Sequence, residues 1–178
     1  MRPATIFAAA FALSLGLGPT LALADGGGGG GGGGTNADCP RGEVYDSRSH
    51  KCVRQQGSVL PDKVLSDYAY ALAKAERYDE ALTTLDLLRN PNTAEALNYR
   101  GYATRKLGRL DEGIGYYLKS VALAPRYAQV REYLGEAYVT KGDKAAAEAQ
   151  LQAIQGICGT NCEQYKHLAE AIAAPSKM

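Results

Sequence analysis

AEALNYRGYATRKLGRLDEGIGYYLKSVALAP, residues 94–125, is the stretch that decides the fold of this chain. Two helical patterns lie in it, separated by Gly108, which is suited to end a helix. Leu97, Gly101 and Thr104 share one face of the first helix, and Gly101 would let the neighbouring backbone approach closely. Apolar residues recur at the same helical spacing in the second helix, at Ile114, Tyr117, Leu118 and Val121. Neither helix can bury its apolar face alone, so we expect the pair to stack against neighbours.

The same pattern recurs along the chain. The segments RYDEALTTLDLL, RLDEGIGYYLKS and DKAAAEAQLQAI align with one another, and they place Tyr78, Leu110 and Lys144 in equivalent positions, 32 and 34 residues apart. A period of about 34 residues with two helices in each copy indicates a helical repeat array. Gly108 and Gly142 are expected to end their helices, and Asp111 and Asp143 to place carboxylates in the first turns that follow.

Residues 60 to about 157 resemble the tetratricopeptide repeat family. The copy at 94–125 carries Leu97 at the large apolar position, Gly101 at the small crossing position and Pro125 at the close. The other two copies match through Leu65, Tyr68, Ala69, Leu72, Ala81 and Leu85, and through Leu134, Gly135, Tyr138, Ala147 and Leu151. Arg100 stands where the family usually has Leu, and Gly113 where it has Ala. The resemblance implies an all-α fold: a superhelical array of three helix-turn-helix repeats.

After the third copy, CGTNCEQYKHLAEAIAAP, residues 158–175, predicts one more helix that caps the array. Thr160 and Glu163 have the spacing of a capping box at its start. Its apolar stripe is expected at Cys162, Tyr165, Leu168, Ala169 and Ile172. His167 is expected on the solvent side of this helix.

The chain has four cysteines, and their spacing favours two local disulfides, Cys39 with Cys52 and Cys158 with Cys162. The first bond would close a small hairpin in CPRGEVYDSRSHKCV, residues 39–53, and the second would clamp the cap helix to the array. Two alternatives stay open for Cys158 and Cys162. They could be a redox-active pair, because a thiol at a helix N-terminus is acidic, or they could bind a metal with His167. His50, beside Cys52, offers a similar metal alternative.

The spacing C-x-x-x-C differs from the C-x-x-C of thioredoxin-like enzymes, and no alternation of strands and helices surrounds it. The segment C-G-x-x-C-E-x-Y also resembles the tail of small secreted bacterial tetratricopeptide proteins. Both points favour the structural disulfide over the redox pair and the metal site.

The first 24 residues have the features of a secretory signal peptide: Arg2, an apolar run over 6–17, and small residues before a cleavage site after Ala24. The alternative is a membrane anchor, for which the apolar run is too short. Residues 25–38 contain nine consecutive glycines and are expected to be a flexible linker, either a spacer or a tract without a role. The expected organisation is therefore signal peptide 1–24, linker 25–38, disulfide-closed motif 39–53 and repeat domain 60–174, in the periplasm or secreted.

Charge and composition exclude several classes of function. The chain has 20 Lys and Arg against 19 Asp and Glu, and removal of the signal peptide with Arg2 balances them. A balanced chain gives no global reason to bind nucleic acid or an anionic membrane. No nucleophile-base, paired-carboxylate or phosphate-loop pattern occurs, and the acids at 79–80 and 111–112 suit helix N-termini. We therefore expect no enzymatic activity, no cofactor and no metal.

The family resemblance implies that the first helices of the repeats line a concave groove that binds peptides. The residues carried over to this groove are Lys63, Tyr70, Lys74, Asn98, Tyr102, Arg105, Lys106, Glu132, Glu136 and Thr140. A groove that is basic at one end suits a peptide whose acidic group lies against Lys74, Arg105 and Lys106. The chain does not reproduce the carboxylate clamp of chaperone-binding members, so binding of chaperone tails is not expected. The alternative is that these charges are ordinary solvated side chains.

Three hypotheses of function follow. The leading one is a periplasmic adaptor or scaffold that binds a peptide segment of a partner protein in the groove. The second is a structural module that associates with itself by end-to-end stacking. The third is a thiol-disulfide redox protein.

Overall fold

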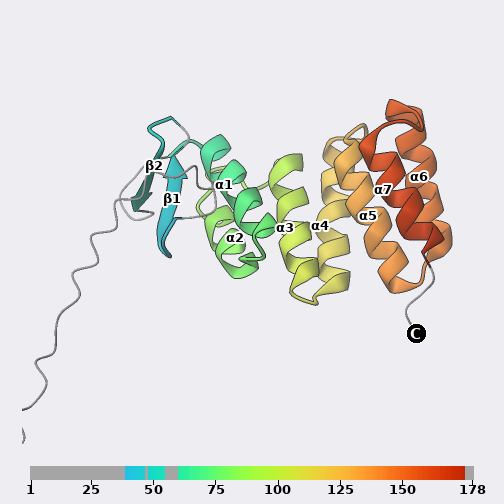
Figure 1. Cartoon of the computed structure of the whole chain (residues 1–178), viewed down its shortest axis with the longest axis horizontal. Helices are drawn as coiled ribbons and strands as arrows, with labels where there is room; N and C mark the ends of the chain where they lie inside the picture. The colour runs from blue at the N-terminus through green and yellow to red at the C-terminus, as the bar shows by residue number, and fades with distance from the viewer. Residues whose placement is uncertain (1–38, 47, 55–59, 175–178) are drawn as a thin grey trace, which may run out of the picture. The chain divides into compact units, whose positions relative to one another are not determined.

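The computed structural model describes residues 39–46, 48–54 and 60–174, and within these ranges the chain forms seven helices and one two-stranded sheet (Figure 1). The elements are β1 (Glu43–Asp46), β2 (Lys51–Arg54), α1 (Asp62–Lys74), α2 (Tyr78–Leu85), α3 (Ala94–Lys106), α4 (Leu110–Leu123), α5 (Ala128–Lys141), α6 (Lys144–Cys158) and α7 (Glu163–Ala173). The expected signal peptide and glycine linker lie outside the described residues. None of the helices described is long and apolar enough to cross a membrane.

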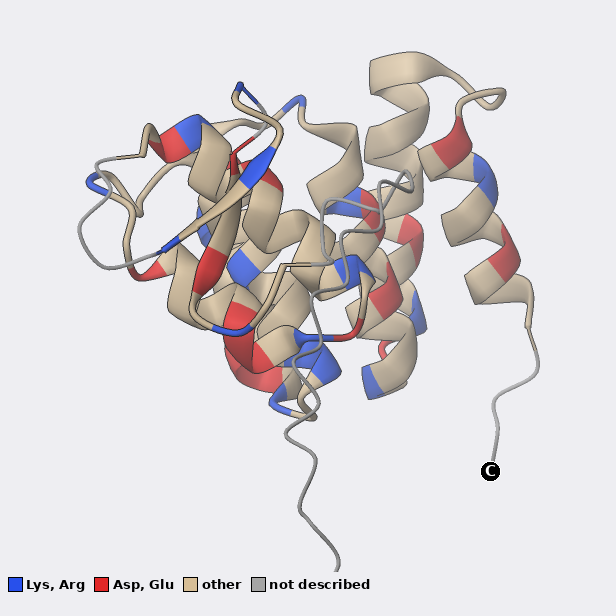
Figure 2. Ribbon diagram, turned by 60° about the vertical axis from the view of Figure 1, so that its left-hand side comes forward, with Lys and Arg blue, Asp and Glu red and all other residues tan. Residues whose placement is uncertain are grey.

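The helices form three pairs, α1 with α2, α3 with α4 and α5 with α6, and α7 follows them. Tyr78, Leu110 and Lys144, the three residues aligned by the sequence repeat, are the first residues of α2, α4 and α6. Each pair packs internally and against the next pair, because α2 and α1 contact α3 while α4 and α3 contact α5 (Figure 1). The expected all-α repeat array is confirmed. Figure 2 shows that basic and acidic residues are interspersed along the ribbon of its helices.

Local signals position the helix ends. The Thr93 hydroxyl accepts a hydrogen bond from the backbone N–H of Ala96 at 3.1 Å and so caps α3. Asp143 caps α6 in the same way, at 3.0 Å, so this residue stands just before the helix and not in its first turn. Gly108 follows α3 and Gly142 ends α5, both at a positive φ that favours glycine.

Two glycines let α3 and α4 cross closely. A Cβ atom on Gly101 would lie 2.7 Å from the ring of Tyr117, which is fully buried. A Cβ atom on Gly113 would lie 3.0 Å from the carbonyl oxygen of Gly101. The departure from the family pattern at position 113 therefore has a physical reason, since the α3 backbone occupies the space of the missing methyl group.

The apolar stripe expected on α4 is only partly correct. Ile114 and Tyr117 are buried, but Leu118 is 48% exposed. Ser120 is fully buried in its place, because its hydroxyl donates a hydrogen bond to the carbonyl oxygen of Ala94 at 2.6 Å. A polar residue with a backbone partner thus occupies the packed face that the spacing assigned to leucine.

The hairpin covers the outer face of the first repeat. β1 and β2 pair antiparallel, with Val44 opposite Val53, and the Cys39–Cys52 disulfide closes the motif. Val44 is fully buried and Cys39 is 3% exposed, because β1 packs against α1. The small disulfide-closed hairpin expected from the sequence is therefore present, and it caps the array at its first repeat.

At the other end, α7 packs against α5 and α6, and Leu168 is its one fully buried side chain. The expected capping box at Thr160 is wrong. The helix starts at Glu163 with Cys162 as N-cap, and no side chain caps it. Cys162, which is bonded to Cys158, holds the N-cap position, so Thr160 lies two residues too early to cap the helix.

Candidate functional site

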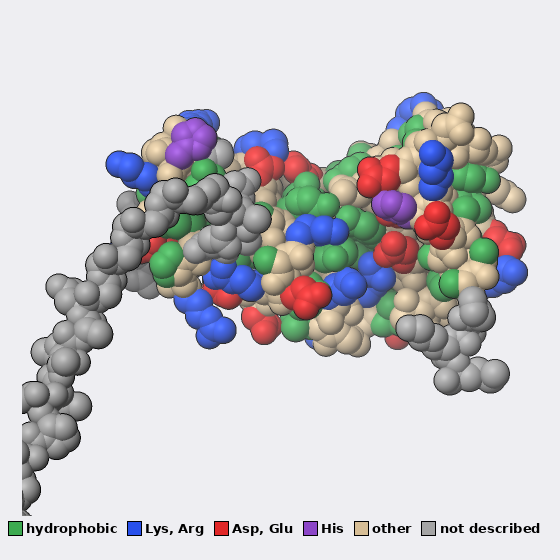
Figure 3. Space-filling model, viewed as in Figure 1, with side chains coloured by type: hydrophobic (Ala, Val, Ile, Leu, Met, Phe, Trp, Pro, Cys, Tyr) green, Lys and Arg blue, Asp and Glu red, His purple; other side chains and the backbone are tan. Residues whose placement is uncertain are grey.

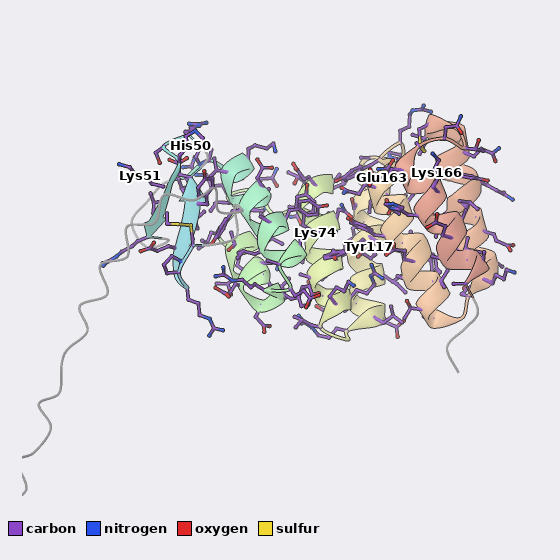
Figure 4. All side chains as sticks on the ribbon, in the orientation of Figure 1. His50, Lys51, Lys74, Tyr117, Glu163 and Lys166 are labelled. Carbon is purple, nitrogen blue, oxygen red and sulfur yellow. A yellow bond between two sulfur atoms is a disulfide. The ribbon has the colours of Figure 1, made fainter. Side chains whose placement is uncertain are left out.

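A hollow of about 300 Å³ lies among α1, α3, α5 and α7. We call it the tyrosine hollow. Its lining residues are Tyr70, Lys74, Tyr102, Lys106, Gln129, Glu132, Tyr133, Glu136, Glu163, Gln164 and His167. Figure 3 shows this face of the molecule: hydrophobic side chains fill its middle, and acidic side chains and a histidine gather over α5 and α7. Lys74 and Glu163, from the first and last helices of the array, are labelled on this face in Figure 4.

Tyrosine rings form the wall of the hollow. Tyr102 and Tyr133 lie with their ring centroids 5.1 Å apart, and Tyr70 stacks on Tyr99 at 4.6 Å. Gln129 Nε2 donates to the hydroxyls of Tyr70 and Tyr133, each at 3.4 Å. Burial raises the pKa of Tyr102, Tyr99 and Tyr133, so all three phenols stay protonated. The wall therefore offers flat apolar faces with neutral hydroxyl and amide groups between them.

Two lysines converge on one ring. The ammonium groups of Lys74 and Lys106 each lie 5.7 Å from the centroid of Tyr102. Both side chains are exposed, and no carboxylate among the described residues forms an ion pair with either of them. Two like charges near one aromatic ring repel each other, and an anion bound near both would relieve that repulsion.

Arg105, the third cation expected in the groove, does not line the hollow. Its side chain is 11% exposed, and its guanidinium donates to Glu136 Oε2 at 2.8 Å. Glu136 lines the hollow, but its carboxylate is engaged by this pair. Arg105 and Glu136 therefore hold α3 to α5 and leave the lysines as the exposed cations of the hollow.

Three other residues carried over from the family also lie elsewhere. Asn98 is fully buried, and its amide donates to the hydroxyl of Tyr127 at 3.2 Å, so it supports the wall from within. Lys63 pairs with Asp67 on the surface of α1. Thr140 donates to a backbone carbonyl of its own helix at 2.9 Å. The structure thus brings together Tyr70, Lys74, Tyr102, Lys106, Glu132 and Glu136 of the expected set.

The cap helix contributes His167, which is about half exposed, in agreement with the solvent-side position expected from the sequence, and which also reaches α5. His167 Nδ1 lies 2.9 Å from Glu132 Oε1, and its Nε2 lies 3.8 Å from Glu163 Oε1. Burial raises the pKa of Glu132, and the hydrogen bond to His167 opposes that shift. The same hydrogen bond raises the pKa of His167. Because Glu132 is 5% exposed, the imidazole is the partner that satisfies it.

Sequence reasoning missed five residues of the hollow. Gln129 and Tyr133 could have been found, since they share a helical face with Glu132 and Glu136 at spacings of three and four. Glu163, Gln164 and His167 belong to α7, and no pattern inside that helix says which side meets α5. Their place depends on the packing of the cap.

Both disulfides are formed in the structure, and none of the described cysteines is free. Cys158 ends α6 and Cys162 precedes α7, so this bond joins the last repeat to its cap. Within the described ranges, no group of His, Cys, Asp and Glu side chains is arranged to hold a metal ion.

The sequence profile named "Tetratricopeptide repeat" matches residues 66–128 and 105–161, which together span more than half of the chain. Among solved structures, a crystal structure of MamA is similar, with a TM-score of 0.54, 19% identity and coverage of 62% of this chain and 66% of that one. A second, described as MamA MSR-1 C2, has a TM-score of 0.51 and 26% identity over 62% of this chain and 65% of that one. This chain therefore spans less than two thirds of the MamA chains that it matches.

A third similar structure is PcrH in complex with the chaperone binding region of PopD. Its TM-score is 0.52 and its identity 15%, and the match covers 65% of this chain and 91% of that one. No curated protein matches the sequence.

Proposed function

Because the chain belongs to the tetratricopeptide repeat family, we propose that it is a protein-interaction module that binds an extended segment of a partner protein in the tyrosine hollow. The observation that carries the proposal is the convergence of Lys74 and Lys106 on the ring of Tyr102 without an anionic partner among the described residues. A carboxylate of the partner, from an acidic side chain or a chain end, would complete this arrangement.

The rest of the lining suits a peptide backbone. The hydroxyls of Tyr70 and Tyr133 and the amide of Gln129 can exchange hydrogen bonds with peptide groups, while the ring faces pack against side chains. Large, rigid aromatic side chains lose little conformational entropy when a ligand binds, which favours affinity. The similar fold of PcrH has a region of PopD bound to it, which supports a binding role for this fold.

Two features favour this proposal over self-association and redox chemistry. The hairpin packs on α1 and α7 packs on α5 and α6, so part of each end face needed for end-to-end stacking is already covered. Cys158 and Cys162 are bonded to each other across the junction of α6 and α7, a position that suits a structural link between the last repeat and its cap. We therefore propose a binding function without catalysis.

The test is a selection of random 12-residue peptides displayed on phage against the full chain, with its disulfides formed. We expect selected peptides to contain acidic residues, and we expect Lys74→Glu and Lys106→Glu each to weaken their binding about tenfold or more, as for a lost charge-assisted hydrogen bond. Lys119→Glu is the matched control, because the Lys119 ammonium also lies 5.7 Å from a tyrosine ring, that of Tyr116, which does not line the hollow. Equal binding by all three variants and the unmodified chain would contradict the proposal.

We also propose that the protein works in the periplasm after cleavage behind Ala24, with residues 25–38 as a tether. Two disulfides suit an oxidising compartment, and the N-terminal sequence has the features of a signal peptide. The mass of the protein recovered from the periplasm of a bacterial host tests this. A chain that keeps residues 1–24, or that stays in the cytoplasm, would contradict it.

A further inference from the structure

A second hollow, of about 410 Å³, lies beside the first. The turn before β1, the α1–α2 turn and the end of α3 form it. We call it the acidic hollow. Its lining residues are Arg41, Gly42, Glu43, Tyr68, Leu72, Glu76, Arg77, Tyr78, Asp79, Glu80, Thr83 and Leu107. It is larger than the tyrosine hollow, and its main walls come from the hairpin and the first repeat.

The charge of this hollow is negative. Four carboxylates and two guanidinium groups line it. Glu80 forms an ion pair with Arg77, whose guanidinium donates hydrogen bonds to both carboxylate oxygens at 2.7 and 2.8 Å. Arg41 Nε lies 3.8 Å from Glu80 Oε1. Of the remaining carboxylates, Glu76 and Asp79 form no ion pair with any described residue, while Glu43 stands opposite Arg54 in the hairpin. The negative charge in excess therefore belongs to groups that a ligand can reach.

A buried hydroxyl provides a second, independent indication. Tyr68 lines the hollow and is 2% exposed, yet its hydroxyl has no well-formed hydrogen bond to any described residue. Burial raises the pKa of this hydroxyl, and the nearby Arg77 guanidinium opposes the shift by its charge and by a weak hydrogen-bonding interaction, so the hydroxyl lies at the charged side of the hollow. A buried polar group without a well-formed hydrogen bond is costly, and a ligand donor that reached it would remove the cost.

The two hollows adjoin. Lys106 lines the tyrosine hollow and the next residue, Leu107, lines the acidic one. The rings of Tyr78 and Tyr102, one from each hollow, meet edge to face with centroids 6.5 Å apart. An extended chain bound in the tyrosine hollow can therefore pass over these rings into the acidic hollow.

We propose that the acidic hollow binds an arginine side chain of the same partner segment whose carboxylate lies between Lys74 and Lys106. This inference rests on the proposed function of the tyrosine hollow. A guanidinium offers several donors in a plane for carboxylates and for the Tyr68 hydroxyl, and it stacks on aromatic rings such as Tyr78. The preferred partner segment thus carries an acidic group and an arginine, placed to reach the two hollows at once.

The test uses the full chain labelled with ¹⁵N, titrated with N-acetyl-arginine amide and followed by the backbone amide signals. We expect shifts at Glu76, Asp79 and the residues around them. The neutral isostere N-acetyl-citrulline amide should bind about tenfold more weakly or worse, because it lacks the charge. The triple variant Glu43→Gln, Glu76→Gln, Asp79→Asn should lose the shifts, and its melting temperature shows whether it is folded. Equal binding of both probes, or shifts retained in a folded triple variant, would overturn the inference.

Two further experiments are needed. One distinguishes a peptide arginine from a free polyamine as the ligand, and the other distinguishes failure of this inference from failure of the proposed function. Spermidine tests a free polyamine as the ligand, and tighter binding of spermidine than of N-acetyl-arginine amide would overturn the peptide source. Lys119 lines neither hollow, so Lys119→Glu should bind N-acetyl-arginine amide as the unmodified chain does, whereas Lys74→Glu should lose acidic peptides. If Lys74→Glu loses acidic peptides but N-acetyl-arginine amide does not bind to the unmodified chain, only the arginine inference is refuted. If N-acetyl-arginine amide binds but Lys74→Glu still binds acidic peptides normally, the function proposed for the tyrosine hollow is refuted.

Discussion

A Cβ atom on Gly135 of α5 would lie 2.4 Å from Cδ2 of Leu168 of α7, so the cap helix rests directly on the backbone of the last repeat. Leu168 is fully buried at this contact. The contact fixes how close α7 comes to α5, and with it the distance between His167 and Glu132. A packing detail between two apolar residues therefore shapes one wall of the tyrosine hollow.

The first prediction tests this contact. Gly135→Ala should destabilise the protein by about 1–3 kcal/mol, because the added methyl group has to displace Leu168 from a packed site. The higher helix propensity of alanine offsets this by at most about 1 kcal/mol. Urea unfolding followed by circular dichroism measures the change. Gly156→Ala in α6 is the control: a Cβ there meets nothing within 4 Å, so that variant should be equally stable or more stable. The same change in both variants would contradict the role of the contact.

The second prediction concerns pH. The hydrogen bond to Glu132 raises the pKa of His167 above 6.5, so folding favours the protonated imidazole. This contribution to stability is complete below pH about 6.5 and is lost as pH rises through the raised pKa. Burial also raises the pKa of Glu132 above 4.5, and the corresponding loss begins at lower pH. We therefore expect the melting temperature to fall as the pH rises above about 6.5 and through the raised pKa of His167.

His167→Gln should flatten this dependence, because glutamine keeps a donor for Glu132 without a charge that titrates. Glu163 and Glu170 on α7 and Glu136 on α5 also act on the pair, and they remain in this variant. Lys166→Gln is the control, since it removes a cation from the neighbouring position and should leave the pH dependence in place. A variant without His167 that melts with the unmodified pH profile would show that this pair is not the cause.

The third prediction ranks the two disulfides. Cys39 and Cys52 are 13 residues apart and Cys158 and Cys162 only four, so their bonds restrict the unfolded chain by about 3 and about 2 kcal/mol respectively. Serine pairs in place of each disulfide should destabilise the protein in that order in urea. Loss of the second bond should also weaken the binding of acidic peptides, because α7 carries part of the hollow. A larger loss of stability from the Cys158–Cys162 pair would contradict the ranking.

The repeat array could be predicted because its signal is local and periodic, and equivalent positions of the sequence repeat fall at the starts of α2, α4 and α6. The hollow could be predicted only in part, because which of its charged side chains are paired and which are free depends on residues far apart in sequence. The sequence predicted Arg105 as a free cation of the groove, but in the structure it forms an ion pair with Glu136, 31 residues later. His167 is about half exposed, as expected, but its hydrogen bond to Glu132, 35 residues earlier, could not be predicted from the sequence. Spacing within a helix cannot report such pairs.

The last prediction separates Arg105 and Glu136 as a structural pair from the lysines that face the ligand. Glu136→Gln leaves the guanidinium of Arg105, 11% exposed, without its carboxylate, and we expect a loss of about 1–3 kcal/mol in urea unfolding. Glu112→Gln breaks the exposed pair with Arg109, about half exposed on both sides, and should change stability by less than about 0.5 kcal/mol. Replacing Arg105 and Glu136 together by leucine should recover most of the loss, because the uncompensated charge is then gone. If Glu136→Gln were as mild as Glu112→Gln, Arg105 would be solvated in solution and would count with Lys74 and Lys106 as a cation of the hollow.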